Sequence, residues 1–252
     1  MLVYGTWQKQ IFEKNTNNSL NLLTIMEHKI SIKTSNGVVS VEDFKAQGVN
    51  KNDVVGVILQ TETIGLIISL DSWKEKWSDG SGVLNKACGE AEALQTLSGL
   101  ELTRTIVNKT KNQEDTMNAA IRCFEYDNGN LQWYLPCLYE LGTIIAYRNE
   151  INKVMQLVGG DEFDEDDWGW SSSELYSNNA WGVNFGNGNF YFYGKFYSFV
   201  VRAVSAFSPL ERGDLSSPSG KGDSYEQLTE ESAIALLRSH GYTGELIKKI
   251  NL

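Results

Sequence analysis

An unusual concentration of aromatic side chains lies in residues 176–199, where ten positions carry Phe, Tyr or Trp, while such residues make up 11% of the whole chain. Asn, Ser and Gly are interleaved with them. Tyr and Trp provide large rigid contact surfaces, and the small polar residues provide adaptable hydrogen bonds and turns. Tyr191, Phe192 and Tyr193 are consecutive, so a pleated strand must turn some of them outward. This chemistry is that of a binding surface, although composition alone fits an aromatic core hairpin turning at residues 186–189 equally well.

Residues that support catalysis or metal binding are sparse. The sequence has no GxSxG, P-loop or HExxH motif. Its cysteines and histidines are isolated and suggest no zinc site: Cys88, Cys123, Cys137, His28 and His240. The carboxylates of residues 161–167 do not have EF-hand spacing, which favours a solvated loop over a calcium site. We therefore expect a protein without catalytic residues, cofactor or bound metal, and not an enzyme.

Charge and hydropathy exclude several classes of partner. A net charge of −10 argues against nucleic acid and anionic membranes, which attract Lys and Arg. No apolar run is long enough for direct membrane insertion, and residues 1–15 lack the pattern of a signal peptide. The few scattered cysteines indicate a reducing compartment. We expect a cytoplasmic protein or part of a phage virion, extracellular only if a particle or another export route carries it.

The elements that must position the aromatic segment follow from hydrophobic periodicity. Asn36-Gly37 separates two alternating runs and predicts a hairpin. Val54–Leu59 and Ile64–Leu70 are short and β-branched, which predicts core strands. Three segments have helical spacing: 84–97, 114–124 and 138–158. The last follows Pro136 and ends before Gly159.

This order of elements predicts an α+β domain over residues 29–207, with an antiparallel sheet and two or more packed helices. Residues 1–28 are interpreted as a lead-in or assembly segment. Residues 208–252 are predicted to be a linker followed by a short C-terminal helical appendage. Thr229 is its expected N-cap and Gly241 its expected C′ residue.

Residues 168–207 contain the fragments WSSSE, AW, NF and VRAVSAF. This pattern resembles the variable region of C-type-lectin-fold proteins that retroelements diversify, a group that includes phage tropism determinants. WYLPCLYELGTIIAYRNEINKVMQLVGG resembles the WYLP-type strand and helix of that family, and Gly56–Leu70 resembles its initial strands. The resemblance covers roughly residues 52–207 and implies a C-type-lectin-like fold.

In that family, adenine-directed mutagenesis changes Asn-type codons while a scaffold frame stays fixed. The residues that match the frame are Trp170, Ser172, Glu174, Ala180, Trp181, Phe185, Gly188, Lys195, Val201 and Arg202. The interposed residues, implied to be diversified and ligand-binding, are Leu175, Tyr176, Asn178, Asn179, Gly182, Asn184, Asn189, Tyr191, Tyr193, Phe196, Tyr197 and Phe199. Leu175 is a less typical product of altering an Asn codon.

The frame also has a physical interpretation. Glu174 and Arg202 carry opposite charges and are predicted to pair beneath the hairpin. Trp181 is the expected core anchor and Phe185 is expected to point inward. Tyr191, Tyr193, Tyr197, Asn178, Asn179 and Asn184 are expected to share one exposed surface.

Two hypotheses about function follow. The first is a retroelement-diversified ligand- or receptor-binding protein, such as a phage tail protein or surface-displayed adhesin, with a protein or cell-surface ligand and a possible homo-oligomer. The alternative is a non-diversified structural or formylglycine-generating-enzyme-like member of the same fold. That enzyme resemblance requires paired cysteines near the domain end, whereas residues 168–207 contain none.

Overall fold

The computed structural model describes residues 28–79, 82, 84–85, 87–96, 98–110 and 118–207. Residues 1–27 of the predicted lead-in segment lie outside the described residues, as do the linker and helix predicted for residues 208–252. Within the described ranges, no helix is both long enough and apolar enough to cross a membrane.

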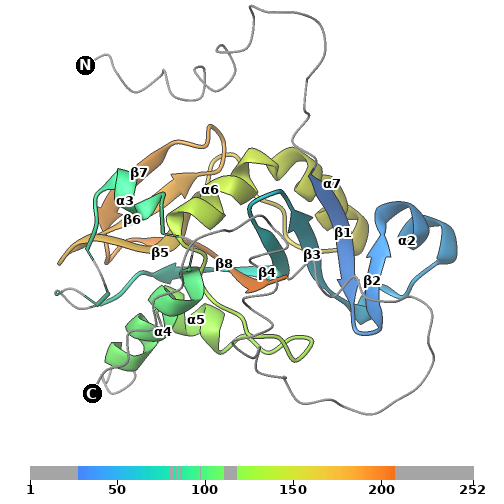
Figure 1. The fold of residues 1–252 in the computed structure, drawn as a ribbon, viewed down its shortest axis with the longest axis horizontal. Coiled ribbons are helices and arrows are strands. Elements are labelled where there is room, and N and C mark those ends of the chain that lie inside the picture. Colours follow the sequence, from blue (N-terminus) through green and yellow to red (C-terminus); the bar gives the residue numbers. More distant parts are fainter. Residues whose placement is uncertain are drawn as a thin grey trace, which may run out of the picture. The chain divides into compact units, whose positions relative to one another are not determined.

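The strands form one eight-stranded sheet in the order β2-β1-β3-β4-β8-β5-β6-β7 (Figure 1). Their bounds are β1 (Lys29–Thr34), β2 (Gly37–Ser40), β3 (Val54–Gln60), β4 (Gly65–Lys76), β5 (Trp168–Tyr176), β6 (Asn179–Asn184), β7 (Phe190–Gly194) and β8 (Ser198–Ala206). Neighbouring strands are antiparallel except β5 and β8, which are parallel where Gly169 pairs with Val200. The last strand therefore lies in the middle of the sheet and joins its two halves.

Helices cover both faces of this sheet. They are α2 (Val41–Gln47), α3 (Glu90–Ala93), α4 (Gly99–Thr110), α5 (Ala119–Phe124), α6 (Leu138–Ala146) and α7 (Arg148–Val158), with a 3-10 turn at Lys51–Asp53. Val57 and Leu59 of β3 pack with residues of α6 and α7, whereas Val55 and Ile58 pack with residues of α4 and α5. Figure 1 shows these two helix pairs on opposite sides of the strands. β3 is thus buried almost throughout because successive side chains alternate between two covered faces. The predicted α+β class is confirmed.

The predicted N-terminal hairpin is confirmed, since β1 pairs antiparallel with β2 from Gly37 onward. The second strand is shorter than the alternation of residues 38–44 suggested, because a helix begins at Val41. The Ser40 hydroxyl caps that helix by accepting a hydrogen bond from the Asp43 amide at 2.9 Å. The helix ends at Gly48, whose φ of 62° is left-handed.

The helix predictions agree best with the structure where Pro precedes the segment and Gly follows it. The helix predicted over residues 138–158 has the expected ends but is divided at Tyr147 into α6 and α7. The helix predicted from residue 114 is described only from Ala119, after Asn118 as N-cap. The prediction of one helix over residues 84–97 is wrong, because among the described residues of that range only Glu90–Ala93 is helical. α4 was not predicted.

Candidate functional site

The part of the sheet formed by β5 to β8 carries a continuous set of aromatic rings. We define it as the aromatic face: Trp168, Tyr191, Tyr193, Phe196, Tyr197 and Phe199. The Tyr193 ring lies at its centre, 5.0 Å from Trp168, 4.9 Å from Phe199 and 5.3 Å from Tyr191 between centroids. Tyr197 stacks parallel to Phe199 at 6.1 Å and contacts Phe196 at 4.5 Å. Contacts with neighbouring rings therefore hold these side chains in place.

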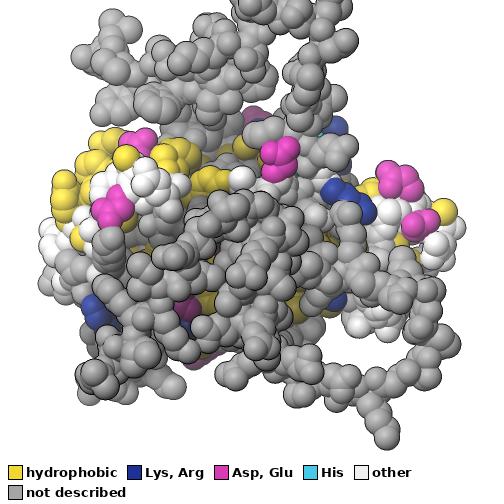
Figure 2. All heavy atoms as spheres, viewed as in Figure 1, with side chains coloured by type: hydrophobic (Ala, Val, Ile, Leu, Met, Phe, Trp, Pro, Cys, Tyr) yellow, Lys and Arg dark blue, Asp and Glu magenta, His cyan; other side chains and the backbone are white. Residues whose placement is uncertain are grey.

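Several of these rings are open to solvent. The exposed fractions are 51% for Tyr191, 64% for Phe196 and 48% for Tyr197, and nearby Tyr176 is 60% exposed. Tyr193 and Phe199 are half-buried. Figure 2 shows hydrophobic side chains gathered where β6 and β7 lie, with acidic side chains beside them. The segment thus presents an exposed surface and is not solely an aromatic core hairpin.

β7 is also fixed from its opposite side. The Phe190 ring packs so closely on α6 that a Cβ at Gly142 would lie 2.9 Å from it. Phe192 contacts the buried Trp181 ring at 5.7 Å while remaining at the surface. β7 is thereby held against the core through Phe190, while Tyr191 and Phe192 are exposed and Tyr193 is half-buried.

The predicted diversified positions differ in exposure. Exposed positions are Tyr176, Asn178, Asn189, Tyr191, Phe196 and Tyr197, and half-buried ones are Asn179, Asn184, Tyr193 and Phe199. Leu175 and Gly182 are buried, contrary to the expectation for a variable surface. Leu175 packs in the core on the α6–α7 side. Gly182 of β6 is directly opposite Tyr191 of β7. A Cβ added at Gly182 would lie 2.9 Å from the Gly169 carbonyl oxygen.

The frame residues show the opposite behaviour. Gly188 is half-buried in a turn with a φ of 71°. The other frame residues are buried: Trp170, Ser172, Glu174, Ala180, Trp181, Phe185, Lys195, Val201 and Arg202. The expected inward orientation of Trp181 and Phe185 is confirmed, and the Trp181 indole donates a hydrogen bond to the Cys88 carbonyl at 3.1 Å.

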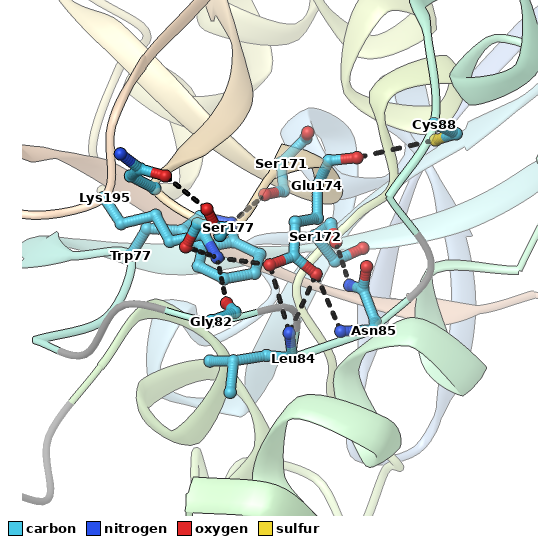
Figure 3. A network of polar contacts seen from close by, with 11 residues as sticks. Trp77, Gly82, Leu84, Asn85, Cys88, Ser171, Ser172, Glu174, Ser177 and Lys195 are labelled. Atoms are coloured by element: carbon cyan, nitrogen blue, oxygen red, sulfur yellow. Dashed lines mark hydrogen bonds and ion pairs between the residues drawn. The ribbon is translucent and has the colours of Figure 1, made fainter.

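A buried polar network supports the turn that carries Phe196 and Tyr197 (Figure 3). The Lys195 ammonium group forms an ion pair with Glu174 and donates to the carbonyl oxygens of Gly82 at 2.8 Å and Ser177 at 2.9 Å. It also lies 4.7 Å from the centre of the Trp77 ring. Burial lowers the pKa of Lys195, while its bond to Glu174 acts in the opposite direction.

Glu174 connects this turn to a distant part of the chain. Its carboxylate accepts hydrogen bonds from the backbone amides of Leu84 at 3.0 Å and Asn85 at 2.7 Å. Its carbonyl oxygen accepts a bond from the Cys88 amide at 2.9 Å. These contacts explain why the predicted helix does not start at residue 84, since this stretch instead bonds to the end of β5.

The predicted pairing of Glu174 with Arg202 is wrong. Because Gly169 pairs with Val200, Arg202 lies near residue 171, and Glu174 lies farther along β5. The Arg202 guanidinium donates to the carbonyl oxygens of Ser69 and Leu70, both at 3.0 Å, and of Asp161 at 2.9 Å. Burial lowers its pKa to about 10. Arg202 thus ties β8 to β4 and to the start of the acidic loop.

Sequence reasoning missed the half-buried Trp168 of the aromatic face and the exposed Phe192 on the other side of β7. The period-two spacing places Trp168 and Trp170 on one face of β5, but Trp170 is buried, so this spacing alone does not predict that Trp168 reaches the surface. Among the described residues, no group of three or more His, Cys, Asp or Glu side chains is placed to hold a metal ion. The buried thiols of Cys123 and Cys137 have pKa values raised by desolvation.

Comparison with known proteins gives information on the fold. No protein-family model matches the chain, and no curated protein matches it. Among solved structures, it is similar to a fimbrial protein from Bacteroides ovatus ATCC 8483, with a TM-score of 0.52 and 13% sequence identity. The match covers 70% of this chain and 48% of the fimbrial protein, so the chain spans about half of that neighbour's length. At this identity, the likeness is one of fold.

Proposed function

We propose that the chain is a ligand-binding protein that recognises a protein on a cell or particle surface through its aromatic face. One observation carries the proposal: exposed aromatic and Asn residues alternate with a buried frame within residues 168–207. On such a surface, the exposed side chains can be substituted while the buried frame maintains the fold.

The physical character of the aromatic face supports binding. Contiguous exposed apolar surface in a folded domain commonly marks an interaction site. Tyr191, Tyr193 and Tyr197 combine apolar rings with hydroxyl groups, and their ring contacts restrict them before a ligand arrives. Binding therefore costs little side-chain entropy, and the hydroxyls remain available for directional hydrogen bonds.

We further propose that a retroelement diversifies the exposed positions, as the resemblance of residues 168–207 implies. The exposed interposed positions carry Asn, Tyr and Phe, which are products expected from Asn-type codons. Leu175 and Gly182 are excluded from the proposed ligand-binding set because they are buried. The fimbrial name of the structural neighbour is compatible with display at a surface.

Sequencing the gene and its flanks in independent isolates tests diversification. We expect a near-copy of the coding segment with adenines at the variable codons, beside a reverse transcriptase gene. Amino-acid differences should concentrate at positions such as Tyr191 and Tyr197 and spare Glu174, Trp181 and Lys195. Differences spread evenly over both sets, or no such near-copy, would contradict the proposal.

A further inference from the structure

A recess lies on the same side of the sheet as the aromatic face. β4 and β8 pair antiparallel, with Glu75 opposite Phe199 and Trp73 opposite Val201. Directly opposite side chains on paired strands share one face. Trp73 and Phe199 also pack against the same hydrophobic cluster, on the α4–α5 side. The aromatic face therefore continues across β8 toward Trp73.

The recess is a pocket of about 220 Å³ lined by Trp73, Arg122, Glu125, Tyr126 and Asp127. The Trp73 and Tyr126 rings meet edge to face at 5.0 Å. The Tyr126 hydroxyl donates to Asp71 at 2.7 Å, and its ring packs on Trp133 at 5.1 Å. The aromatic walls of the pocket are thus held in place by contacts outside it.

The charges at this pocket favour a cation. The Arg122 guanidinium lies over the Trp73 ring, 5.8 Å from its centre, and its Nε is 2.8 Å from a carboxylate oxygen of Glu75, which compensates its charge locally. Glu125 and Asp127 are exposed at the pocket. Aromatic rings and carboxylates both attract ammonium and guanidinium groups, and Tyr126, Glu125 and Asp127 supply them beside the Arg122 that already lies over Trp73. An anionic group would instead meet an excess of carboxylates.

We propose that this pocket accepts the Lys or Arg side chain of a protein bound on the aromatic face. The proposal rests on the proposed function. Pockets that enclose a whole drug-sized ligand measure about 300–1,000 Å³, so this smaller one suits a single side chain. A Lys or Arg also has an apolar stem that packs along aromatic walls while its charged end reaches the carboxylates.

Small cationic probes test the pocket without the natural ligand. The full chain, labelled with ¹⁵N, is titrated with N-acetyl-arginine amide and with N-acetyl-citrulline amide, a neutral compound of nearly the same shape. The Trp73 indole N–H resonance, assigned with the W73F variant, reports occupancy. We expect a saturable shift with the arginine probe and a much smaller one with the citrulline probe.

Two charge-matched double variants locate the effect. E125Q/D127N removes the two carboxylates of the pocket, and E62Q/D166N removes two exposed carboxylates on other loops. We expect the first to weaken arginine binding about threefold or more and the second to leave it nearly unchanged. Matching melting temperatures establish that the variants are folded.

The proposal is overturned if the arginine probe gives no saturable shift, if citrulline binds equally well, or if both double variants weaken binding equally. These outcomes leave the proposed function intact, because they concern the pocket alone. Failure of the proposed function would instead appear in the isolate sequences, which do not depend on Glu125 or Asp127.

Discussion

The Lys195 ammonium group and the Glu174 carboxylate form an ion pair whose two side chains are almost completely shielded from solvent. Lys195 lies in the turn between β7 and β8, and Glu174 lies near the end of β5. The pair therefore holds the turn bearing Phe196 and Tyr197 against a strand and against residues 82–88. A binding surface on a turn requires such support if its shape is to persist.

Removing one partner of this pair should strongly destabilise the fold. We expect K195M to lower the free energy of unfolding by about 3–5 kcal/mol, because it leaves the buried Glu174 charge without its cation. The control is K74M, which breaks the exposed pair of Lys74 with Asp167 and should cost no more than about 1 kcal/mol. Urea unfolding measures both values, and equal losses in the two variants would contradict this role.

The double variant E174Q/K195M separates charge pairing from packing. Because both charges are removed, its loss of stability should be smaller than the sum of the two single losses, with a coupling of about 1–3 kcal/mol. Strict additivity of the two losses would mean that the ion pair contributes little beyond the separate contacts of each side chain.

Much of the fold could be predicted from local patterns. β3 and β4 are rich in β-branched residues, and the segment that forms α6 and α7 follows Pro136 and ends before Gly159. α4 escaped prediction since Thr103, Thr105 and Thr110 have weak helix propensity. The Thr103 hydroxyl bonds to the Leu135 backbone at 3.1 Å, a tertiary contact that local spacing does not contain. In α4, tertiary contacts therefore outweigh the weak helix propensity of its threonines.

The candidate site likewise has features that local patterns predict and features that depend on tertiary contacts. Of the twelve interposed residues, six are exposed and four half-buried. The partner of Glu174 was not predicted, because it depends on the placement of β8 between β4 and β5. Gly182 was included because Gly is an expected product of an altered Asn codon, whereas the structure shows it buried, with the Gly169 carbonyl oxygen 2.9 Å from where a Cβ would lie. Both differences concern contacts between neighbouring strands, whose register local sequence patterns do not contain.

Frame and surface substitutions should differ in their effect on stability. W181A removes a buried ring and an indole hydrogen bond, so we expect a loss of about 3–5 kcal/mol. Y191S and Y197S remove exposed rings and should each cost no more than about 1 kcal/mol. Thermal or urea unfolding provides the comparison. Tyrosine variants that unfold as readily as W181A would place these rings in the core.

Gly182 should not tolerate a side chain, despite lying within the diversified segment. In G182N the new Cβ meets the Gly169 carbonyl oxygen, and we expect a loss of about 1–3 kcal/mol from overpacking. N189S, at an exposed position, serves as the control and should remain within about 0.5 kcal/mol of the unchanged protein. If G182N is as stable as N189S, Gly182 belongs among the variable positions after all.

Stability should depend on pH through Glu140. Burial raises the pKa of this carboxyl above its ordinary value of 4.5. The unfolded chain loses the proton near that value, whereas the folded protein retains it to higher pH. The resulting contribution to stability is therefore complete below pH 4.5 and is lost as the pH rises through the raised pKa.

The variant E140Q isolates this dependence, because its neutral amide does not titrate. We expect the stability of the unchanged protein relative to E140Q to increase as the pH is lowered from about 8 toward 4.5. Urea unfolding at a series of pH values measures the difference. Parallel curves for the two proteins would show that Glu140 does not have a raised pKa.

We propose that a rigid buried frame carries exposed aromatic positions that can change freely. The measurement that tests it most directly is the folded fraction, by protease resistance, of two displayed libraries of the full chain. One randomises Tyr191, Phe196 and Tyr197 of the aromatic face together with the exposed Tyr176, and the other randomises Trp170, Glu174, Trp181 and Lys195. We predict that most clones of the first library fold and that few of the second do. Equal folded fractions, or loss of folding in the first library, would contradict the account.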